Sequence, residues 1–216
     1  MRRLPVYLVL DTSGSMMGEP IESVKNGVHV MINSLRQNPQ AIETAFLSVI
    51  TFGTTAKQVI PLTDLASFQM VDIKASGVTA LGDALRLTAE CIDKEVEKTT
   101  IQTKGDWKPL IFLMTDGVPT DDWKVGLEEF KKRKKGLVIA CGAGNGADSK
   151  ILKQITENVV RLDNADSGSI SKYFQWLSAT ISVTSEKIED TGKDIPNINE
   201  LPPPPSEIIL DFEKWL

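Results

Sequence analysis

Three oxygen-bearing side chains alternate along one short segment near the start of the chain, at Asp11, Ser13 and Ser15. The glycine between the two serines favours a tight loop, so the carboxylate and the two hydroxyls could converge on one point. Clustered oxygen atoms suit hard cations. Mg²⁺ takes about six oxygens and keeps several waters, so a few hydroxyls with one or two carboxylates suffice. The segment is therefore a candidate Mg²⁺ site, open also to Mn²⁺ or Ca²⁺, with one coordination position left for an outside ligand.

A second acid, Asp116, stands in a similar setting farther along the chain. Asp11 follows the apolar run at residues 6–10, and Asp116 closely follows the apolar run at residues 110–114. Both runs have the composition of buried strands. Ligands of open α/β sheets bind beyond the carboxyl ends of the strands, so we expect both carboxylates at one edge of a sheet. A loop rich in Asp, Ser and Gly is, taken alone, more typical of a turn or a helix cap.

The elements that must position these residues alternate between strand and helix. Strand-like runs occupy residues 6–10, 45–52, 57–62, 110–114, 137–141 and 159–162. Apolar residues at helical spacing mark residues 21–35, 81–96, 123–130, 151–155 and 170–181. Helix-length connections require parallel neighbours, whereas the short turn before residues 57–62 makes that run antiparallel. We predict a doubly wound α/β fold, with a mostly parallel six-stranded sheet, one antiparallel edge strand and helices on both faces.

The pattern Asp-x-Ser-x-Ser at Asp11, Ser13 and Ser15 resembles the metal motif of von Willebrand factor type A (VWA) domains. Two further signatures of that family follow in order, a Thr after a small-residue turn at Thr79 and an Asp-Gly pair at Asp116. The resemblance implies a Rossmann-like fold with a metal-ion-dependent adhesion site (MIDAS). The two serines would then be direct ligands. The two acids would coordinate the metal ion directly or through water, and the threonine would join the coordination shell in one of two states of the domain.

The likeness covers about residues 4–184, and one position departs from the family pattern. Val78 stands where many relatives have a second glycine, which restricts the backbone before Thr79. The function implied by the resemblance is metal-dependent protein binding, in which an Asp or Glu of a partner protein completes the metal shell. This interpretation makes the chain a binding domain and not an enzyme.

A narrower likeness is to the TerY-type proteins of bacterial tellurite-resistance gene clusters. It is carried by the run Asp-Thr-Ser-Gly-Ser-Met-x-Gly-Glu-Pro-Ile at residues 11–21, by Thr79-Ala-Leu-Gly and by the Pro-rich tail. Proteins of that type are associated with a Ser/Thr kinase and a PP2C-type phosphatase. The likeness therefore implies a scaffold in a cytoplasmic phosphorylation or stress module.

A glycine-rich segment at residues 142–147 is the main rival site. It follows an expected strand, precedes an expected helix and has Asp163 about 20 residues later, so it imitates a dinucleotide-binding fingerprint. A nucleotide-binding enzyme is thus the alternative interpretation. A glycine turn between strand and helix is favoured, because the fingerprint normally opens the first of two nucleotide-binding halves and only about one unit of chain remains here. His29 is the only histidine, and a Walker loop is absent. The sequence therefore offers no evident nucleophile and base for catalysis.

Composition narrows the classes of partner. A formal charge of −5 argues against nucleic-acid binding, which usually needs a basic face to neutralise phosphates. No apolar run approaches the roughly 18 residues of a membrane-spanning helix. Cys91 and Cys141 lie in apolar segments and fit a reducing compartment. We expect a cytoplasmic protein that binds neither membranes nor nucleic acid.

The folded domain is expected to occupy residues 1–185, followed by a Pro-rich linker and an apolar tail at residues 186–216. Four consecutive prolines in this region make a stiff extended spacer. In the tail, Ile208 and Phe212 fit one helical face with Trp215, or one strand face with Leu210, so periodicity leaves its form open. The tail is apolar enough that it should pack either on its own domain or on a partner.

Overall fold

The computed structural model describes residues 2–133, 136–194 and 198–211. The strands are β1 (Leu4–Asp11), β2 (Ala45–Phe52), β3 (Ala56–Asp64), β4 (Leu110–Thr115), β5 (Leu137–Ala143), β6 (Val159–Leu162) and β7 (Ile208–Leu210). The α-helices are α1 (Glu19–Leu35), α2 (Pro39–Thr44), α3 (Leu81–Glu95), α4 (Trp123–Arg133), α5 (Ser149–Ile155) and α6 (Ser167–Thr191). Two 3-10 helices are η1 (Gly14–Met16) and η2 (Ile198–Glu200).

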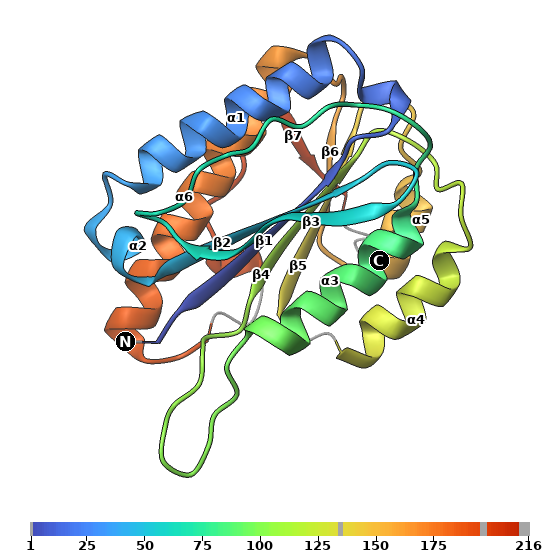
Figure 1. The fold of residues 1–216 in the computed structure, drawn as a ribbon. Helices are drawn as coiled ribbons and strands as arrows, with labels where there is room; N and C mark the ends of the chain where they lie inside the picture. The colour runs from blue at the N-terminus through green and yellow to red at the C-terminus, as the bar shows by residue number, and fades with distance from the viewer. Residues whose placement is uncertain (1, 134–135, 195–197, 212–216) are drawn as a thin grey trace, which may run out of the picture.

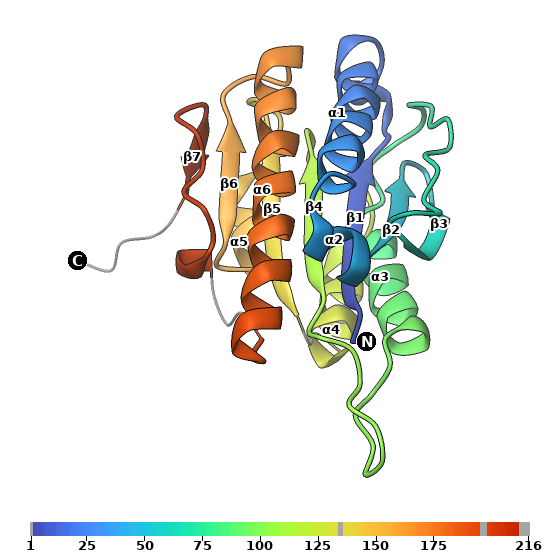
Figure 2. The ribbon, with the colours of Figure 1, turned by 90° about the vertical axis from the view of Figure 1, so that its left-hand side faces the viewer.

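These strands form one sheet in the order β3-β2-β1-β4-β5-β6-β7. β1 lies between β2 and β4 and is parallel to both, and the parallel pairing continues through β5 to β6. β3 is antiparallel to β2 at one edge. Figure 1 and Figure 2 show α1, α2 and α6 on one face of the sheet and α3, α4 and α5 on the other. The predicted doubly wound, mostly parallel α/β fold is confirmed.

The described part of the sheet has seven strands, one more than predicted. The additional strand, β7, comes from the tail and pairs antiparallel with β6, with Ile208 opposite Leu162 and Leu210 opposite Val160. The side chain of Ile208 is buried in the core. This part of the tail therefore packs on its own domain. Three residues that follow a Pro-rich spacer carry too short a pattern to predict a strand, and the other apolar positions of the tail, Phe212 and Trp215, lie outside the described residues.

Helix α6 crosses the domain boundary that was expected at residue 185. It continues to Thr191 because Ile188 is still buried, and it ends where Gly192 adopts a left-handed conformation with φ of 64°. The Trp176 Nε1–H then donates a hydrogen bond of 2.9 Å to the carbonyl of Pro202, which ties the Pro-rich segment to the helix. Neither α6 nor any other helix in the described ranges combines the length and the apolar character needed to cross a bilayer.

Strand β1 is buried along its whole length because both faces of the sheet are covered. Its side chains alternate between two layers of the core. Leu8 and Leu10 pack in the layer that contains α1 and α6, whereas Tyr7 and Val9 pack in the layer that contains α3 and α4. The carboxyl end of β1, at Asp11, is therefore anchored by a buried strand in the interior of the sheet.

Candidate metal centre

The two predicted acids lie at the same edge of the sheet because they end neighbouring parallel strands. The register pairs Leu10 of β1 with Met114 of β4, so Asp11 and Thr115 follow side by side. The Thr115 hydroxyl donates a hydrogen bond of 2.5 Å to the Asp11 Oδ2. Asp116 comes directly after this contact. The sequence-based expectation that the carboxyl ends of the two strands meet is confirmed.

A continuous chain of hydrogen bonds joins four of the five predicted ligands. The Asp11 Oδ1 accepts a bond of 2.7 Å from the backbone N–H of Ser13. The Ser13 and Ser15 hydroxyl oxygens are 3.0 Å apart. The Ser15 hydroxyl then donates to the Asp116 Oδ1 at 2.7 Å. Residues more than a hundred positions apart in sequence are thus gathered into one cluster of oxygen atoms.

Thr79, the fifth predicted residue, borders the same cluster. A Cβ built on Gly117 would lie 3.4 Å from the Thr79 hydroxyl oxygen and 3.9 Å from the Ser15 hydroxyl oxygen, so both hydroxyls border one small volume. Thr120 fixes the Thr79 backbone: its hydroxyl accepts from the Thr79 N–H at 3.1 Å, and its own N–H donates to the Thr79 carbonyl at 2.9 Å. The Thr79 hydroxyl is therefore held near the Ser15 hydroxyl, and 5% of the surface of Thr79 is exposed.

The departure at Val78 leaves the backbone unstrained. The left-handed conformation in this turn belongs to Gly77, with φ of 78°, and no non-glycine residue in the described part has a positive φ. Gly77 also accepts a hydrogen bond of 2.9 Å from the Gly14 N–H, and Ser76 donates one of 2.7 Å to the Thr12 carbonyl. These backbone contacts fasten the Thr79 loop to the loop that carries the two serines.

Both carboxylates are partly or fully withdrawn from water. Asp11 is 1% exposed, and burial raises the pKa of its carboxyl, although hydrogen bonds from Ser13 and Thr115 oppose the rise. Burial raises the pKa of Asp116 as well, opposed by the Ser15 hydroxyl. The salt bridges of the described residues reach neither acid. A bound cation would offset the cost of placing these charges away from water.

The donor set fits a hard divalent ion. It consists of three hydroxyls and two carboxylates, all of them oxygen ligands. Only two of its members are acids, so it is not a cluster of three or more Asp, Glu, His or Cys side chains. The described residues contain no cluster of that kind. The alternation of Asp11, Ser13 and Ser15 is the local sequence signal of this donor set.

The chain matches the von Willebrand factor type A domain over residues 6–175. The chain therefore belongs to the VWA family. The Asp11 loop, the Thr79 turn and the Asp116 turn come together at the carboxyl edge of its sheet, as the resemblance of the motifs implied. The narrower likeness to TerY-type proteins receives no support from the relatives described next.

Relatives of this VWA domain are larger proteins. The uncharacterized protein sll0103 of Synechocystis sp. (strain ATCC 27184 / PCC 6803 / Kazusa) is 35% identical over 123 residues, which cover 54% of this chain and 26% of that protein. The inter-alpha-trypsin inhibitor heavy chain H4 of Bos taurus is 28% identical over 123 residues, covering 53% of this chain and 13% of the relative. The chain thus corresponds to about a quarter or less of these two relatives.

Solved structures share the fold of this VWA domain. The pilus adhesin SpaC from Lactobacillus rhamnosus GG superposes with a TM-score of 0.69 at 18% identity, covering 85% of this chain and 31% of that one. Proximal thread matrix protein 1 from the mussel byssus, in a form with a zinc-occupied MIDAS motif, gives a TM-score of 0.61 at 20% identity, with 85% and 46% covered. At this level of identity the likeness concerns the fold.

Several residues that support the site were not predicted from the sequence. Thr115 orients the Asp11 carboxylate, Gly117 leaves room between two hydroxyls, and Thr120 fixes the Thr79 backbone. Asp121 belongs to this set as well, because its two carboxylate oxygens accept the backbone N–H groups of Gly82 and Asp83 at the start of α3. Contacts between segments about 40 residues apart leave no periodic signal in a sequence.

Replacing Asp121 with alanine is expected to destabilise the domain by about 1–2 kcal/mol, because the N-terminus of α3 loses its side-chain acceptor. Chemical denaturation of both proteins in urea measures the difference. Asp122→Ala is the matched control, since this exposed neighbour should change stability by less than about 0.5 kcal/mol. Equal stability of the two variants would contradict the assigned cap.

The rival glycine segment has packing roles in this structure. Gly144 takes the left-handed conformation at the end of β5, with φ of 76°, and a Cβ on Gly146 would lie 2.4 Å from the Asp116 carbonyl oxygen. The glycine at 146 thus lets its loop approach the metal-site turn. The N-terminus of α5, where a nucleotide phosphate would bind, carries the Asp148 carboxylate as its cap, which would repel an anion.

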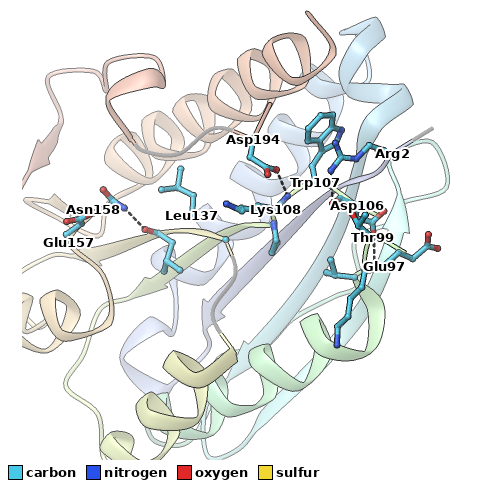
Figure 3. Close-up of a pocket in the computed structure, with 15 residues that line it drawn as sticks. Arg2, Glu97, Thr99, Asp106, Trp107, Lys108, Leu137, Glu157, Asn158 and Asp194 are labelled. Atoms are coloured by element: carbon cyan, nitrogen blue, oxygen red, sulfur yellow. Dashed lines mark hydrogen bonds between the residues drawn. The ribbon is translucent and has the colours of Figure 1, made fainter. Parts of the chain in front are cut away.

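A hollow of about 760 Å³ lies at the opposite edge of the sheet, where β4 and β5 begin. Figure 3 shows Arg2 and Trp107 together at this hollow, and the Arg2 guanidinium lies 3.4 Å from the centroid of the Trp107 ring. The backbone N–H of Lys108 donates to the Asp194 carboxylate at 2.9 Å. None of the five predicted ligands lines this hollow, which is therefore separate from the candidate metal centre.

Proposed function

We propose that the chain is a metal-dependent protein-binding module whose MIDAS-type site holds one Mg²⁺ ion. The ligands would be Asp11, Ser13, Ser15, Thr79 and Asp116. The hydrogen-bonded chain from Asp11 to Asp116 carries this proposal, because it joins four of these five oxygen ligands from two loops at one edge of the sheet. Membership of the VWA family supports it, as does the zinc-occupied MIDAS motif of the mussel protein. Mn²⁺ or Ca²⁺ would suit the same donors.

Each residue would have a distinct role toward the ion. The Ser15 hydroxyl is exposed, so it opens the site to solvent and to an incoming ligand. Asp11 is buried and held by the Ser13 N–H and the Thr115 hydroxyl, which fix the orientation of its carboxylate. A carboxylate from a partner protein would complete the coordination shell and so make binding dependent on the metal. This role is one of binding and not of catalysis.

The motif likeness to TerY-type proteins makes a Ser/Thr kinase and a PP2C-type phosphatase the first partners to test. In that setting the domain would act as a scaffold in a bacterial tellurite-resistance or stress phosphorylation module in the cytoplasm. A partner in this proposal must present an exposed Asp or Glu. Membranes and nucleic acids have no part in it, and the formal charge of −5 fits their exclusion.

Capture of binding proteins from an extract of the source cells, followed by titration of each purified candidate, tests the function. Binding should be lost in EDTA, return with Mg²⁺, and weaken at least about tenfold when the contacting Asp or Glu of the partner becomes Asn or Gln. A hydrogen-bond acceptor of similar shape remains in that partner variant, so only the charge is removed. Equal affinity in EDTA and in Mg²⁺ would overturn the proposal.

A further inference from the structure

Three large apolar side chains are exposed directly beside the proposed metal ligands. Met17 is 59% exposed, Val78 49% and Val118 52%. Each stands one or two positions from a proposed ligand, and each belongs to a different loop of the site. Single exposed apolar side chains are ordinary on protein surfaces, but a group around a ligand site is typical of an interaction surface. We call these three residues the apolar rim.

The backbone holds the rim in place before any partner arrives. Met16 is fully buried, whereas Met17 lies outside the core, between η1 and α1. The hydrogen bond from the Gly14 N–H to the Gly77 carbonyl joins the Met17 loop to the Val78 loop. A second bond, from the Thr120 N–H to the Thr79 carbonyl, joins the Val78 loop to the Val118 loop. The three side chains are therefore presented by loops that are fastened to one another.

The charge of the site limits the number of acids that a partner can place there. Residues 11–18, 76–80 and 115–120 contain no Lys or Arg. The carboxylates of Asp11 and Asp116 would together balance the charge of one divalent cation. A single partner carboxylate would coordinate the ion, but a second acid beside it would find no cation on these loops. The neighbours of that carboxylate would instead meet Met17, Val78 and Val118.

Resting on the metal site proposed above, we propose that the apolar rim selects partner segments in which one Asp or Glu is flanked by apolar side chains. The acid would bind the metal, and its neighbours would bury the rim. The metal would bind the carboxylate of any partner segment. Burial of apolar surface beside that carboxylate would add affinity only for segments with apolar neighbours. The departure at Val78 acquires a function in this arrangement, because a glycine at that position would remove one side chain from the rim.

Selection from a displayed library of nine-residue peptides tests the proposal. The central residue is Asp, the flanking positions are random, and the immobilised full chain is used in Mg²⁺ and in EDTA. Peptides that bind only in Mg²⁺ should be enriched in Leu, Ile, Val, Met or Phe next to the Asp. Synthetic copies of the enriched peptides then provide the probe for titration.

The triple variant Met17→Ser, Val78→Ser and Val118→Ser should bind the enriched peptides at least about tenfold more weakly, while retaining its affinity for Mg²⁺. The matched control variant is Val30→Ser, Ile42→Ser and Ile101→Ser, which removes exposed apolar side chains far from the site and should bind like the wild type. Mg²⁺-dependent peptides without apolar residues next to the Asp, or equal binding by both triple variants, would overturn the role proposed for the apolar rim. The proposed metal site would still stand. Absence of any Mg²⁺-dependent peptide would overturn both proposals.

Discussion

Asp11→Asn should weaken Mg²⁺ binding at least about 100-fold, since it removes one of only two carboxylates from the donor set. The amide keeps the shape of the side chain, and its oxygen can still accept the Ser13 N–H that Asp11 Oδ1 accepts at 2.7 Å. The Thr115 hydroxyl can accept from the amide nitrogen instead of donating to Oδ2. The fold should therefore persist while the charge at the ion is lost. Isothermal titration with Mg²⁺, or electron paramagnetic resonance with Mn²⁺, measures the difference.

Thermal unfolding provides a second measurement of the same effect. An ion that binds only the folded state raises the melting temperature of the wild type, and the rise grows with ion concentration. The melting temperature of Asp11→Asn should not respond to Mg²⁺ over the same range. Asp122→Asn is the matched control, because this exposed acid follows the Asp116 turn and is not among the proposed ligands. An unchanged Mg²⁺ affinity in Asp11→Asn would exclude this carboxylate from the site.

The fold could be predicted from the sequence where the apolar patterns are long. Strands buried on both faces, such as β1 and β4, appear as continuous apolar runs, and the helices between them keep their periodicity over several turns. β7 could not be predicted because its three residues have the same apolar character that a helix or an interface would need. Its strand form depends on the exposed edge of β6, which is a property of the assembled sheet.

The residues of the candidate site differ in the kind of sequence information that was needed to predict them. Asp11 and Asp116 follow buried strands, so the rule for strand ends was sufficient to bring them together. Thr79 required the family motif, because no local pattern connects residue 79 to residue 13. The type of a residue alone does not show whether it reaches the site. Asp64 also follows a strand-like run, yet it ends the antiparallel strand β3 opposite Phe46, at the amino end of β2 and away from the metal centre.

The packing of α3 against α4 supports the site and leaves no room for an added methyl group. A Cβ on Gly126 would lie 2.0 Å from the carbonyl oxygen of Gly82 and 2.5 Å from its carbonyl carbon. A Cβ on Gly82 would in turn lie 2.6 Å from the Trp123 Cα. Because backbone atoms meet backbone atoms here, no side-chain rotation can relieve the contact. Asp121 also bonds the Gly82 N–H, so separating the helices would strain the cap as well.

Gly126→Ala is therefore expected to destabilise the domain by about 2 kcal/mol. Overpacking a backbone contact costs about 3 kcal/mol, and the better helix propensity of alanine returns about 1 kcal/mol of that. Unfolding in urea measures the change, and Gly168→Ala is the matched control. Position 168 is exposed in the first turn of α6, and its added Cβ would meet only the Asp166 side chain, at 3.3 Å. The control should keep or slightly raise stability, so an equally stable Gly126→Ala would show that α3 and α4 are not in backbone contact.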